Sequence, residues 1–522
     1  MRPGAHIHIH ADHLTREGVA AGVARWSPSR PRDRPALRPG YRGEDVRRLQ
    51  QRLAELGYDP GPPDGIYGHQ TAEAVRDLQR DCRLRVDGIA GPHVMRALYD
   101  EARWRLRRSH TVAAGQTLAD AARALEVSPQ ILRRAMGLPR RAQPVPGQRL
   151  VLWERVVAAE LKPGPGQAAG LRVLARWAGL VSAASILDSP PPEEEGEQPS
   201  VARGEPHAPG AQSQAPGDAA HAPGAAPQVA GAQPHAPGAA SAAVAAAAAL
   251  GLPVWVTLHT RREPSRLVGS YEPGRLQEVL HGPTQRERFL RRVRVWSKTP
   301  GVAGVHLDLG GLRFGDGPRC LSLLRHLRGE LEGAGQQLIV SVPLRDLRGL
   351  WGRALNDVNW EAVAGLAAWI VLVPPVLIDK ARRPRPPAPA ELAGLLRAIT
   401  RRLPPWRCLL AVPVGALMVP TGAPVRRGPP AAVSWQQAIS LAYGARTRPR
   451  WDDAAQRPAF AGAHGEQEYI VWLENRESLA RKLDVVEALR LGGVYLSAAG
   501  EEDGRVWTAL RERWKVHKPA PE

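Results

Sequence analysis

Very few side chains in the 522-residue chain have the type and spacing of a chemical site. Cys82, Cys320 and Cys408 lie far apart, so we expect buried thiols and neither a disulfide framework nor a metal site. The run from His6 to His10 could bind a metal, although we favour an unfolded tail. Asp308 differs from these because it stands near the end of an apolar run typical of a buried strand. Its carboxylate could take part in acid–base chemistry or could simply hydrogen-bond inside the fold.

The composition limits the classes of partner. The net charge is +20, and nearly all of the positive charge is arginine. It could attract a polyanion such as nucleic acid or an anionic wall polymer. The arginines form no basic block and no nucleic-acid-binding motif accompanies them, so we favour ordinary solvated surface and expect no nucleic-acid partner. We predict no cofactor and no metal site. No stretch reaches the ~20 apolar residues of a membrane span, and residues 1–38 lack the apolar core of a signal peptide.

The length favours two to four domains, and the first is helical. Between residues 37 and 102, apolar residues fall on helical faces. Asp64-Gly65 and Asp87-Gly88 form similar turns before the second and third helices. Thr71 is expected to cap the second helix. We therefore predict a compact three-helix module.

A second small module is predicted over residues 108–153. A strand at residues 110–112 leads through Gly115 into a helix, and Ser128-Pro129 begins another helix with proline at its first position. A strand at residues 150–152 closes the pattern. The order strand, helix, helix, strand indicates a βααβ module.

Two segments have compositions that cannot bury enough apolar surface to fold. Residues 1–36 are rich in His, Arg and Pro. Residues 188–240 contain a Pro/Glu run and three His-Ala-Pro-Gly repeats, which begin at His207, His221 and His235. These histidines could bind a metal, but we favour a drifted repeat. Both segments are expected to be disordered.

From residue 155 to 517, short apolar runs alternate with helical patterns. Continuous apolar strands are typical of parallel sheets buried on both faces. Eight strand–helix repeats favour a closed (β/α)8 TIM barrel, in which active sites lie at the carboxyl ends of the strands. The low-complexity segment then follows the second strand, where a loop tip tolerates an insertion. The eight runs cover residues 156–161, 180–187, 253–258, 304–309, 337–343, 369–373, 408–413 and 493–496.

The first module resembles the type 1 peptidoglycan-binding domain over its whole length. The matching residues include Leu49-Gln50, Leu56-Gly57-Tyr58, Asp64-Gly65, Asp87-Gly88 and Gly91-Pro92. The resemblance implies that the module binds peptidoglycan. We expect the glycan contacts at Asp64, Gly65, Tyr67, Asp87 and Gly88.

The second module resembles the LysM domain, which binds glycans that contain N-acetylglucosamine. The family's Gly-Asp-Thr-Leu motif stands here as Gly115-Gln116-Thr117-Leu118, and its usual Asn after the second helix falls near Met136. The resemblance implies a glycan-binding role for Gly115, Thr117 and Leu118.

The large C-terminal unit resembles glycoside hydrolase family 18, and within it the spore-germination group that carries LysM modules before the barrel. The matching segments are Val433–Ala438, Trp451–Pro458, Tyr469–Glu474, Ser478-Leu479 with Lys482-Leu483, and Gly492–Val494. Family 18 enzymes carry a Glu proton donor at the end of the fourth strand, and a nearby Asp holds the substrate's N-acetyl group.

The resemblance also implies that this active site is eroded. Asp308 keeps the third Asp of the family motif, and Gly310 stands at the catalytic Glu. Pro375 replaces a Tyr, Gly415-Ala416 replaces Tyr-Gly, and Ser497 replaces the Trp of the sugar platform. Asp316 and Glu263 are the candidates for a relocated acid.

These observations favour a non-catalytic binder of peptidoglycan or chitin-like glycans, with no confident catalytic residue beyond the remnant Asp308. The alternative is an active N-acetylglucosaminidase that degrades spore cortex or cell wall. The resemblance implies a location at the spore coat, the cortex or the cell envelope.

Overall fold

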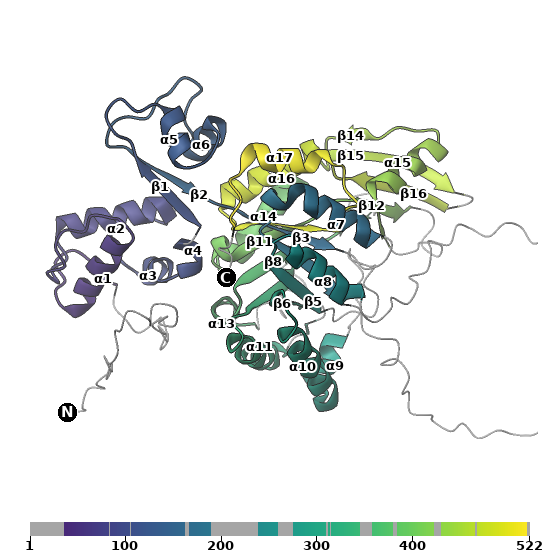
Figure 1. Cartoon of the computed structure of the whole chain (residues 1–522), viewed down its shortest axis with the longest axis horizontal. Coiled ribbons are helices and arrows are strands. Elements are labelled where there is room, and N and C mark those ends of the chain that lie inside the picture. Colours follow the sequence, from purple (N-terminus) through teal and green to yellow (C-terminus); the bar gives the residue numbers. More distant parts are fainter. Residues whose placement is uncertain are drawn as a thin grey trace, which may run out of the picture. The chain divides into compact units, whose positions relative to one another are not determined.

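The structure is a computed structural model of the chain, and it divides into two compact units, Met1–Trp104 and Arg105–Glu522 (Figure 1). The predicted tail and nearly all of the low-complexity insertion lie outside the described residues, so their disorder stays a prediction. The structure describes residues 36–518 except for 83, 105, 162–165, 189–238, 259–274, 310–311, 314, 345–357, 379–383, 422–429 and 465–466.

The first unit contains the three predicted helices, α1 (Glu44–Glu55), α2 (His69–Cys82) and α3 (Pro92–Leu98), followed by the short α4 (Glu101–Trp104). The predicted N-cap at Thr71 is wrong, because α2 already begins at His69. Thr71 is instead buried in the first turn of α2. Its hydroxyl donates to the carbonyl oxygen of Pro60 (3.0 Å) and accepts from the Gln50 side chain (3.1 Å).

A glutamine from the preceding helix fixes each of the two Asp-Gly turns in the same way. Gln50 Nε2 donates to Asp64 Oδ1 (2.9 Å) and to the Ile66 carbonyl (3.1 Å), while Gln50 Oε1 accepts from the Gly65 N–H (2.9 Å). Gln79 makes the corresponding bonds to Asp87 (2.8 Å), the Ile89 carbonyl (3.1 Å) and the Gly88 N–H (2.8 Å). Gly65 and Gly88 have φ of +79° and +70°, which favours glycine at both turns.

The second unit begins with the predicted order of strand, helix, helix and strand. Strands β1 (Arg107–Thr111) and β2 (Arg149–Trp153) pair antiparallel, and helices α5 (Leu118–Ala124) and α6 (Pro129–Met136) lie between them in sequence. Thr117 caps α5 in a capping box with Asp120, and Ser128 caps α6. Each helix therefore starts where the sequence predicts it.

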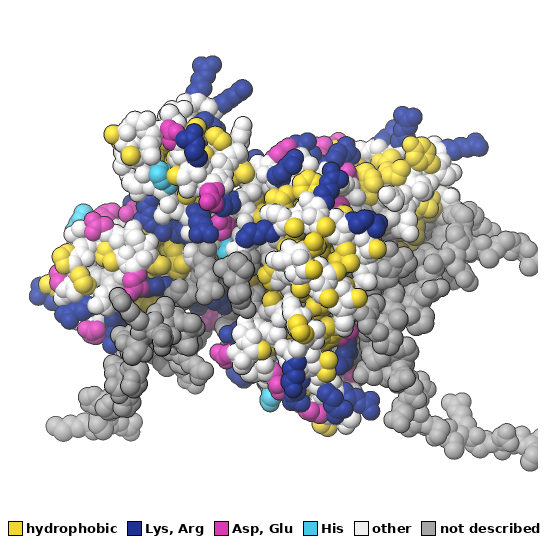
Figure 2. All heavy atoms as spheres, in the orientation of Figure 1, with side chains coloured by type: hydrophobic (Ala, Val, Ile, Leu, Met, Phe, Trp, Pro, Cys, Tyr) yellow, Lys and Arg dark blue, Asp and Glu magenta, His cyan; other side chains and the backbone are white. Residues whose placement is uncertain are grey.

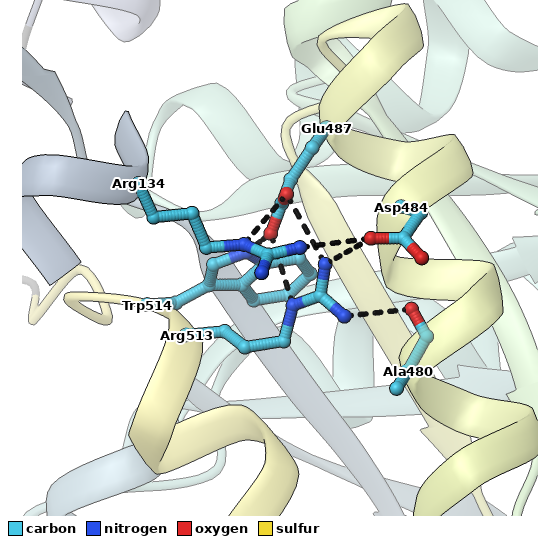
Figure 3. Close-up of polar contacts among 6 residues, drawn as sticks. All are labelled: Arg134, Ala480, Asp484, Glu487, Arg513 and Trp514. Atoms are coloured by element: carbon cyan, nitrogen blue, oxygen red, sulfur yellow. Dashed lines mark hydrogen bonds and ion pairs between the residues drawn. The ribbon is translucent and has the colours of Figure 1, made fainter. Parts of the chain in front are cut away.

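This small module is held against the barrel by ion pairs on α6 (Figure 3). Arg134 contacts Asp484 (2.8 Å) and Glu487 (3.2 Å) of α16 (Arg476–Leu489). Arg513 contacts the same two carboxylates, at 2.5 Å and 3.2 Å, and the Trp514 indole N–H donates to Glu487 (2.9 Å). The shared acidic pair thus joins the module to the carboxyl-terminal segment of the barrel.

Eight parallel strands close the predicted barrel, in the order β11-β17-β3-β4-β5-β6-β7-β8. All eight apolar runs of the sequence are confirmed as barrel strands. The low-complexity insertion follows β4, the second strand, as expected. The strands are β3 (Val156–Leu161), β4 (Ala183–Asp188), β5 (Val254–Leu258), β6 (Val302–Asp308), β7 (Gln337–Pro343), β8 (Trp369–Val373), β11 (Cys408–Pro413) and β17 (Gly493–Ser497).

Helices follow the strands around the barrel and bury their apolar faces against it (Figure 1). The thiols of Cys320 and Cys408 are buried here, and Cys82 is buried in the first unit, as predicted. The helices are α7 (Gly166–Trp177), α8 (Ala239–Ala249), α9 (Arg275–His281), α10 (Pro283–Ser297), α11 (Gly317–Glu332), α13 (Trp360–Leu366), α14 (Pro389–Thr400), α16, and α17 (Arg505–Arg513).

An antiparallel sheet that the apolar runs did not predict is inserted after β11. Its order is β13-β12-β16-β15-β14, and α15 (Trp435–Gly444) packs on one of its faces. Trp472 and Leu417 lie in a separate cluster with Val419 and Ala455. The strands are β12 (Ala416–Pro420), β13 (Ala431–Val433), β14 (Arg450–Asp452), β15 (Arg457–His464) and β16 (Gln467–Leu473).

We predict that Gln79→Ala lowers the free energy of unfolding of the first unit by roughly 1–3 kcal/mol, because it leaves the buried turn N–H groups without their acceptor. Urea denaturation of a fragment spanning residues 36–104 measures this. The control is Gln70→Ala on the same helix, whose side chain bonds the exposed Asp59 (3.1 Å). Equal stability of the two variants would show that the hydrogen bonds of Gln79 to the Asp87-Gly88 turn do not stabilise the unit.

Candidate functional site

The amino-terminal part of the barrel interior is closed by apolar side chains. Leu106, which precedes β1, packs with Val156, Trp255, Trp369 and other strand residues in one buried cluster. This cluster fills the interior where the strands begin. Any site in the barrel must therefore lie toward the carboxyl ends of the strands, as is usual for this fold.

A buried hydrogen-bonded chain of polar side chains crosses the interior above this cluster. Ser185 and Thr257 hydroxyls lie 2.6 Å apart, and Thr257 lies 3.1 Å from Nδ1 of His306. Nε2 of His306 lies 2.5 Å from the Ser341 hydroxyl. His306 is therefore hydrogen-bonded through both ring nitrogens, as expected for a satisfied barrel histidine.

Tyr495 connects this chain to a buried carboxylate that the sequence analysis did not single out. Its hydroxyl donates to Glu160 Oε2 (2.6 Å) and lies 3.0 Å from the Ser185 hydroxyl. Burial, together with the negative charge of Glu160, raises the pKa of Tyr495 well above its usual value. The phenol therefore stays protonated and acts as a donor to the carboxylate.

Asp308, the remnant of the family motif, ends β6 and is 6% exposed. It lies opposite Ser341 in the strand register, just beyond the polar chain. Gly310, two residues further on, lies outside the described residues. The structure thus places Asp308 at the carboxyl end of the barrel, where the sequence predicts it.

Asp316, one of the two candidates for a relocated acid, is held by hydrogen bonds in the structure. Asp316 accepts hydrogen bonds from Gln277 Nε2 (2.6 Å) and the Arg313 N–H (2.6 Å), and lies 2.9 Å from His281 Nε2. Burial favours its protonated form, but the hydrogen bonds outweigh that effect and hold its pKa below the usual value. A carboxylate of this kind does not donate a proton. The other candidate, Glu263, lies outside the described residues.

A pocket opens at the barrel mouth beside β8, β11 and β17. Three positions that the resemblance marked as changed, Pro375, Gly415-Ala416 and Ser497, line this one pocket. Its volume is about 60 Å³, well below the roughly 300–1,000 Å³ of typical small-molecule sites. The lining is mostly Pro, Ala and Val, so the pocket could take a small group with an apolar part.

One wall of the pocket contains a buried ionic cluster. Glu474, at the end of β16, contacts Arg457 Nη2 (3.3 Å) and Lys482 Nζ, and Ser478 Oγ donates to its second oxygen (2.8 Å). Burial lowers the pKa of Lys482 to about 8, an effect that the nearby Arg457 reinforces. These residues lie in segments that resemble the family, but their convergence depends on the inserted sheet, so the sequence alone does not predict the cluster.

The residues predicted to contact glycan in the first unit make hydrogen bonds within that unit. Asp64 and Asp87 accept from Gln50 and Gln79, which lowers the pKa of both carboxyls. Tyr67 is 1% exposed, and its hydroxyl donates to the Gly88 carbonyl (2.8 Å). These residues shape the two turns, and their glycan contacts stay a prediction.

The predicted LysM residues have similar structural roles. Thr117 caps α5, and Leu118 is buried in the core of the module. Gly115 has a φ of +79° in the turn before α5. A glycan contact here would use the turn's backbone.

Within the described residues, no helix is long and apolar enough to cross a membrane, and no group of three or more His, Cys, Asp or Glu side chains could hold a metal ion. On the face shown in Figure 2, Lys and Arg side chains are scattered among acidic ones. The positive charge on this face is spread out and forms no single block.

Residues 42–98 match the family described as "Putative peptidoglycan binding domain". This part of the chain is 47% identical over 57 residues to the N-acetylmuramoyl-L-alanine amidase CwlM of Mycobacterium tuberculosis, covering 11% of this chain and 14% of the amidase. The resemblance predicted for the first module is thereby confirmed.

The barrel has relatives in the predicted group. The "Putative sporulation-specific glycosylase YdhD" of Bacillus subtilis is 23% identical over 231 residues, covering 43% of this chain and 54% of YdhD. The crystal structure of the spore cortex-lytic enzyme SleL of Bacillus megaterium aligns with a TM-score of 0.51 at 16% identity, covering 79% of this chain and 87% of SleL. The chain spans about half the length of YdhD and a smaller part of CwlM. It therefore combines a domain of the peptidoglycan-binding family with a barrel of the SleL fold.

We predict that Tyr495→Phe lowers the free energy of unfolding of the barrel by roughly 1–3 kcal/mol, because it removes the phenol donor from the buried Glu160 carboxylate. The matched control is Tyr443→Phe on α15, where the tyrosine is 79% exposed. Calorimetric melting of the whole chain compares the two. If both variants melt with the wild type, the buried chain does not stabilise the barrel.

Proposed function

We propose that the protein binds cell-wall glycan through its first unit and carries a glycosidase-like barrel that does not hydrolyse it. The observation that carries this proposal is the match of residues 42–98 to the peptidoglycan-binding family, since it includes both glutamine-clamped turns. The clamped turns give a rigid surface, and rigid surfaces lose little entropy on binding. Peptidoglycan or a chitin-like glycan is the partner we propose.

The βααβ module is proposed as a second glycan-binding element of the LysM kind. Its strand pairing and helix caps fit that fold, and Gly115 and Thr117 lie in the turn that would meet the sugar, just before the buried Leu118 at the start of α5. Its ion pairs to α16 fix it relative to the barrel. Two weak sites on one chain raise the effective concentration of each at the polymer, provided that both reach it.

The proposal that the barrel is non-catalytic depends on which residues stand at the family's active-site positions at the barrel mouth. The family position of the proton donor is Gly310, which has no side chain to donate, and Asp316 is held as a hydrogen-bonded carboxylate. Loss of a general acid alone costs roughly 10²–10⁴ in rate. Pro375 and Ser497 also lack the aromatic groups that the family uses around the sugar.

An active N-acetylglucosaminidase is the second candidate. Asp308 favours it, because this carboxylate remains at the end of β6. The names of the relatives also favour it: YdhD is called a glycosylase, and SleL a spore cortex-lytic enzyme. The same relatives support a proposed location at the spore cortex, the spore coat or the cell envelope.

The first unit should pellet with insoluble peptidoglycan. A tagged fragment of residues 36–104 is mixed with purified peptidoglycan or with cellulose, and the pelleted fraction is measured. We expect retention on peptidoglycan only, and tighter retention of the whole chain because its modules act together. If the fragment stays in the supernatant while the whole chain pellets, the peptidoglycan-binding site lies in the second unit and not in the first.

The whole chain should release no reducing ends from cortex fragments or chitooligosaccharides above background, with SleL as the positive control. Asp308→Asn should leave that background unchanged. Turnover by the wild-type chain that Asp308→Asn abolishes would instead establish the glycosidase.

A further inference from the structure

The pocket at the barrel mouth is built from two parts of the fold. Pro375, Pro413 and Ser497 come from the carboxyl ends of barrel strands or the segments after them. Arg457 and Trp472 come from the inserted sheet, and Lys482 comes from α16. A ligand group in this pocket would therefore touch the barrel, the inserted sheet and α16 at once.

The sheet and helix side of the pocket has more positive than negative charge. Arg457 and Lys482 share the single carboxylate of Glu474, and all three are at most 7% exposed. Glu501 also lines the pocket, from beyond β17. Its carboxylate lies close to Gly166, the first residue of α7: Oε1 would be 3.8 Å from a Cβ added to that glycine. The amino terminus of a helix favours a nearby negative charge. Within the buried cluster itself, two cations share the one carboxylate of Glu474.

The same wall holds two buried N–H groups that have no acceptor among the described residues. They are Nε of Arg457 and Nε1 of Trp472, and both side chains line the pocket. Buried donors are nearly always hydrogen-bonded in folded proteins, so two orphaned donors on one wall indicate a missing acceptor. Because one of the two donors belongs to a guanidinium, a charged acceptor such as a carboxylate would bond to it more strongly than a neutral one.

We propose that this pocket is a subsite for a free carboxylate on a short side chain of a wall sugar, such as the lactyl ether of N-acetylmuramic acid. The volume of about 60 Å³ suits such a side group and not a whole ring. The lactyl methyl would meet the Pro, Ala and Val lining, and its carboxylate oxygens would accept from Arg457 and Trp472. The inference rests on the proposed function, because it requires the barrel to meet wall glycan.

The chemistry of the ligand places this site in a reaction sequence. In intact peptidoglycan the lactyl carboxylate is held in an amide bond to the peptide, so it has no negative charge. Only hydrolysis of that amide, in which water adds across the carbon–nitrogen bond, frees the carboxylate and the peptide amine. The pocket would therefore select glycan from which an amidase-type reaction has already removed the peptide.

The test is isothermal titration of the whole chain with the disaccharide of N-acetylglucosamine and N-acetylmuramic acid, compared with the same disaccharide whose lactyl group is amidated. We expect the free carboxylate to bind at least 10-fold more tightly. Trp472→Phe removes one donor and keeps the ring, and Arg457→Met leaves the Glu474–Lys482 pair intact. Each should reduce the preference several-fold without changing binding of the amide. The controls are Trp451→Phe and Arg481→Met, at residues that contact each other away from the pocket.

The preference should also decrease as pH rises. Arg457, Glu474 and, across the pocket, Glu501 are the charged groups around Lys482. Because burial lowers the pKa of Lys482 to about 8, its charge is present at pH 7 and largely lost at pH 9.5. The titration at the two pH values should therefore show a smaller preference at pH 9.5 for the wild type.

Three outcomes separate this inference from the proposed function. Equal binding of the two disaccharides, or a preference that survives both pocket variants, overturns the subsite while leaving wall binding intact. Loss of the preference in the pocket variants, with the chain still pelleting with peptidoglycan, supports the subsite. A chain that binds neither disaccharide and does not pellet with peptidoglycan overturns both proposals.

Discussion

Closure of the eight-stranded barrel is the constraint on which the rest of the second unit depends. Because the strands are parallel and buried on both faces, alternate side chains of each strand enter one interior that excludes water. Apolar side chains and Leu106 fill the part nearest the strand starts. Further up, Glu160 and His306 are buried polar groups, and an unpaired one would cost about 1–3 kcal/mol. Tyr495 joins them, since its hydroxyl donates to Glu160 Oε2 (2.6 Å) and lies 3.4 Å from His306 Nδ1.

The barrel could be predicted from the sequence because each buried parallel strand appears there as a continuous run of apolar residues. The inserted sheet could not be, for a physical reason visible at its first strand. β11, the seventh barrel strand along the chain, ends at Pro413, and β12 begins only three residues later at Ala416. From the sequence, the residues of β12 are therefore easily taken for the loop that follows β11. Its pairing with β16 joins residues from 49 to 57 positions apart, which no local pattern reveals.

The candidate site was predicted only in part for the same reason. Alignment to the family placed Pro375, Gly415 and Ser497 at the mouth, and the structure brings them into one pocket. Their nearness follows from barrel topology, which the sequence predicts. Arg457 and Trp472 reach the pocket from the unpredicted sheet. In the first unit, likewise, the two turns were predicted, but not the glutamines that fix them, since Gln50 and Asp64 are fourteen residues apart.

The buried cluster around Glu474 is not well explained as a source of stability. Taking ions out of water costs several kcal/mol each, and replacing a buried ionic group by apolar side chains is often neutral or stabilising by about 1–4 kcal/mol. Two buried cations on one carboxylate are less favourable still, because the cations repel each other. An anion in the adjoining pocket would accept from Arg457 Nε and Trp472 Nε1, the two N–H groups that the described residues leave without acceptors. The non-catalytic barrel that we propose could still use such a cluster, because selecting a charged group on a glycan requires position and charge and no proton transfer.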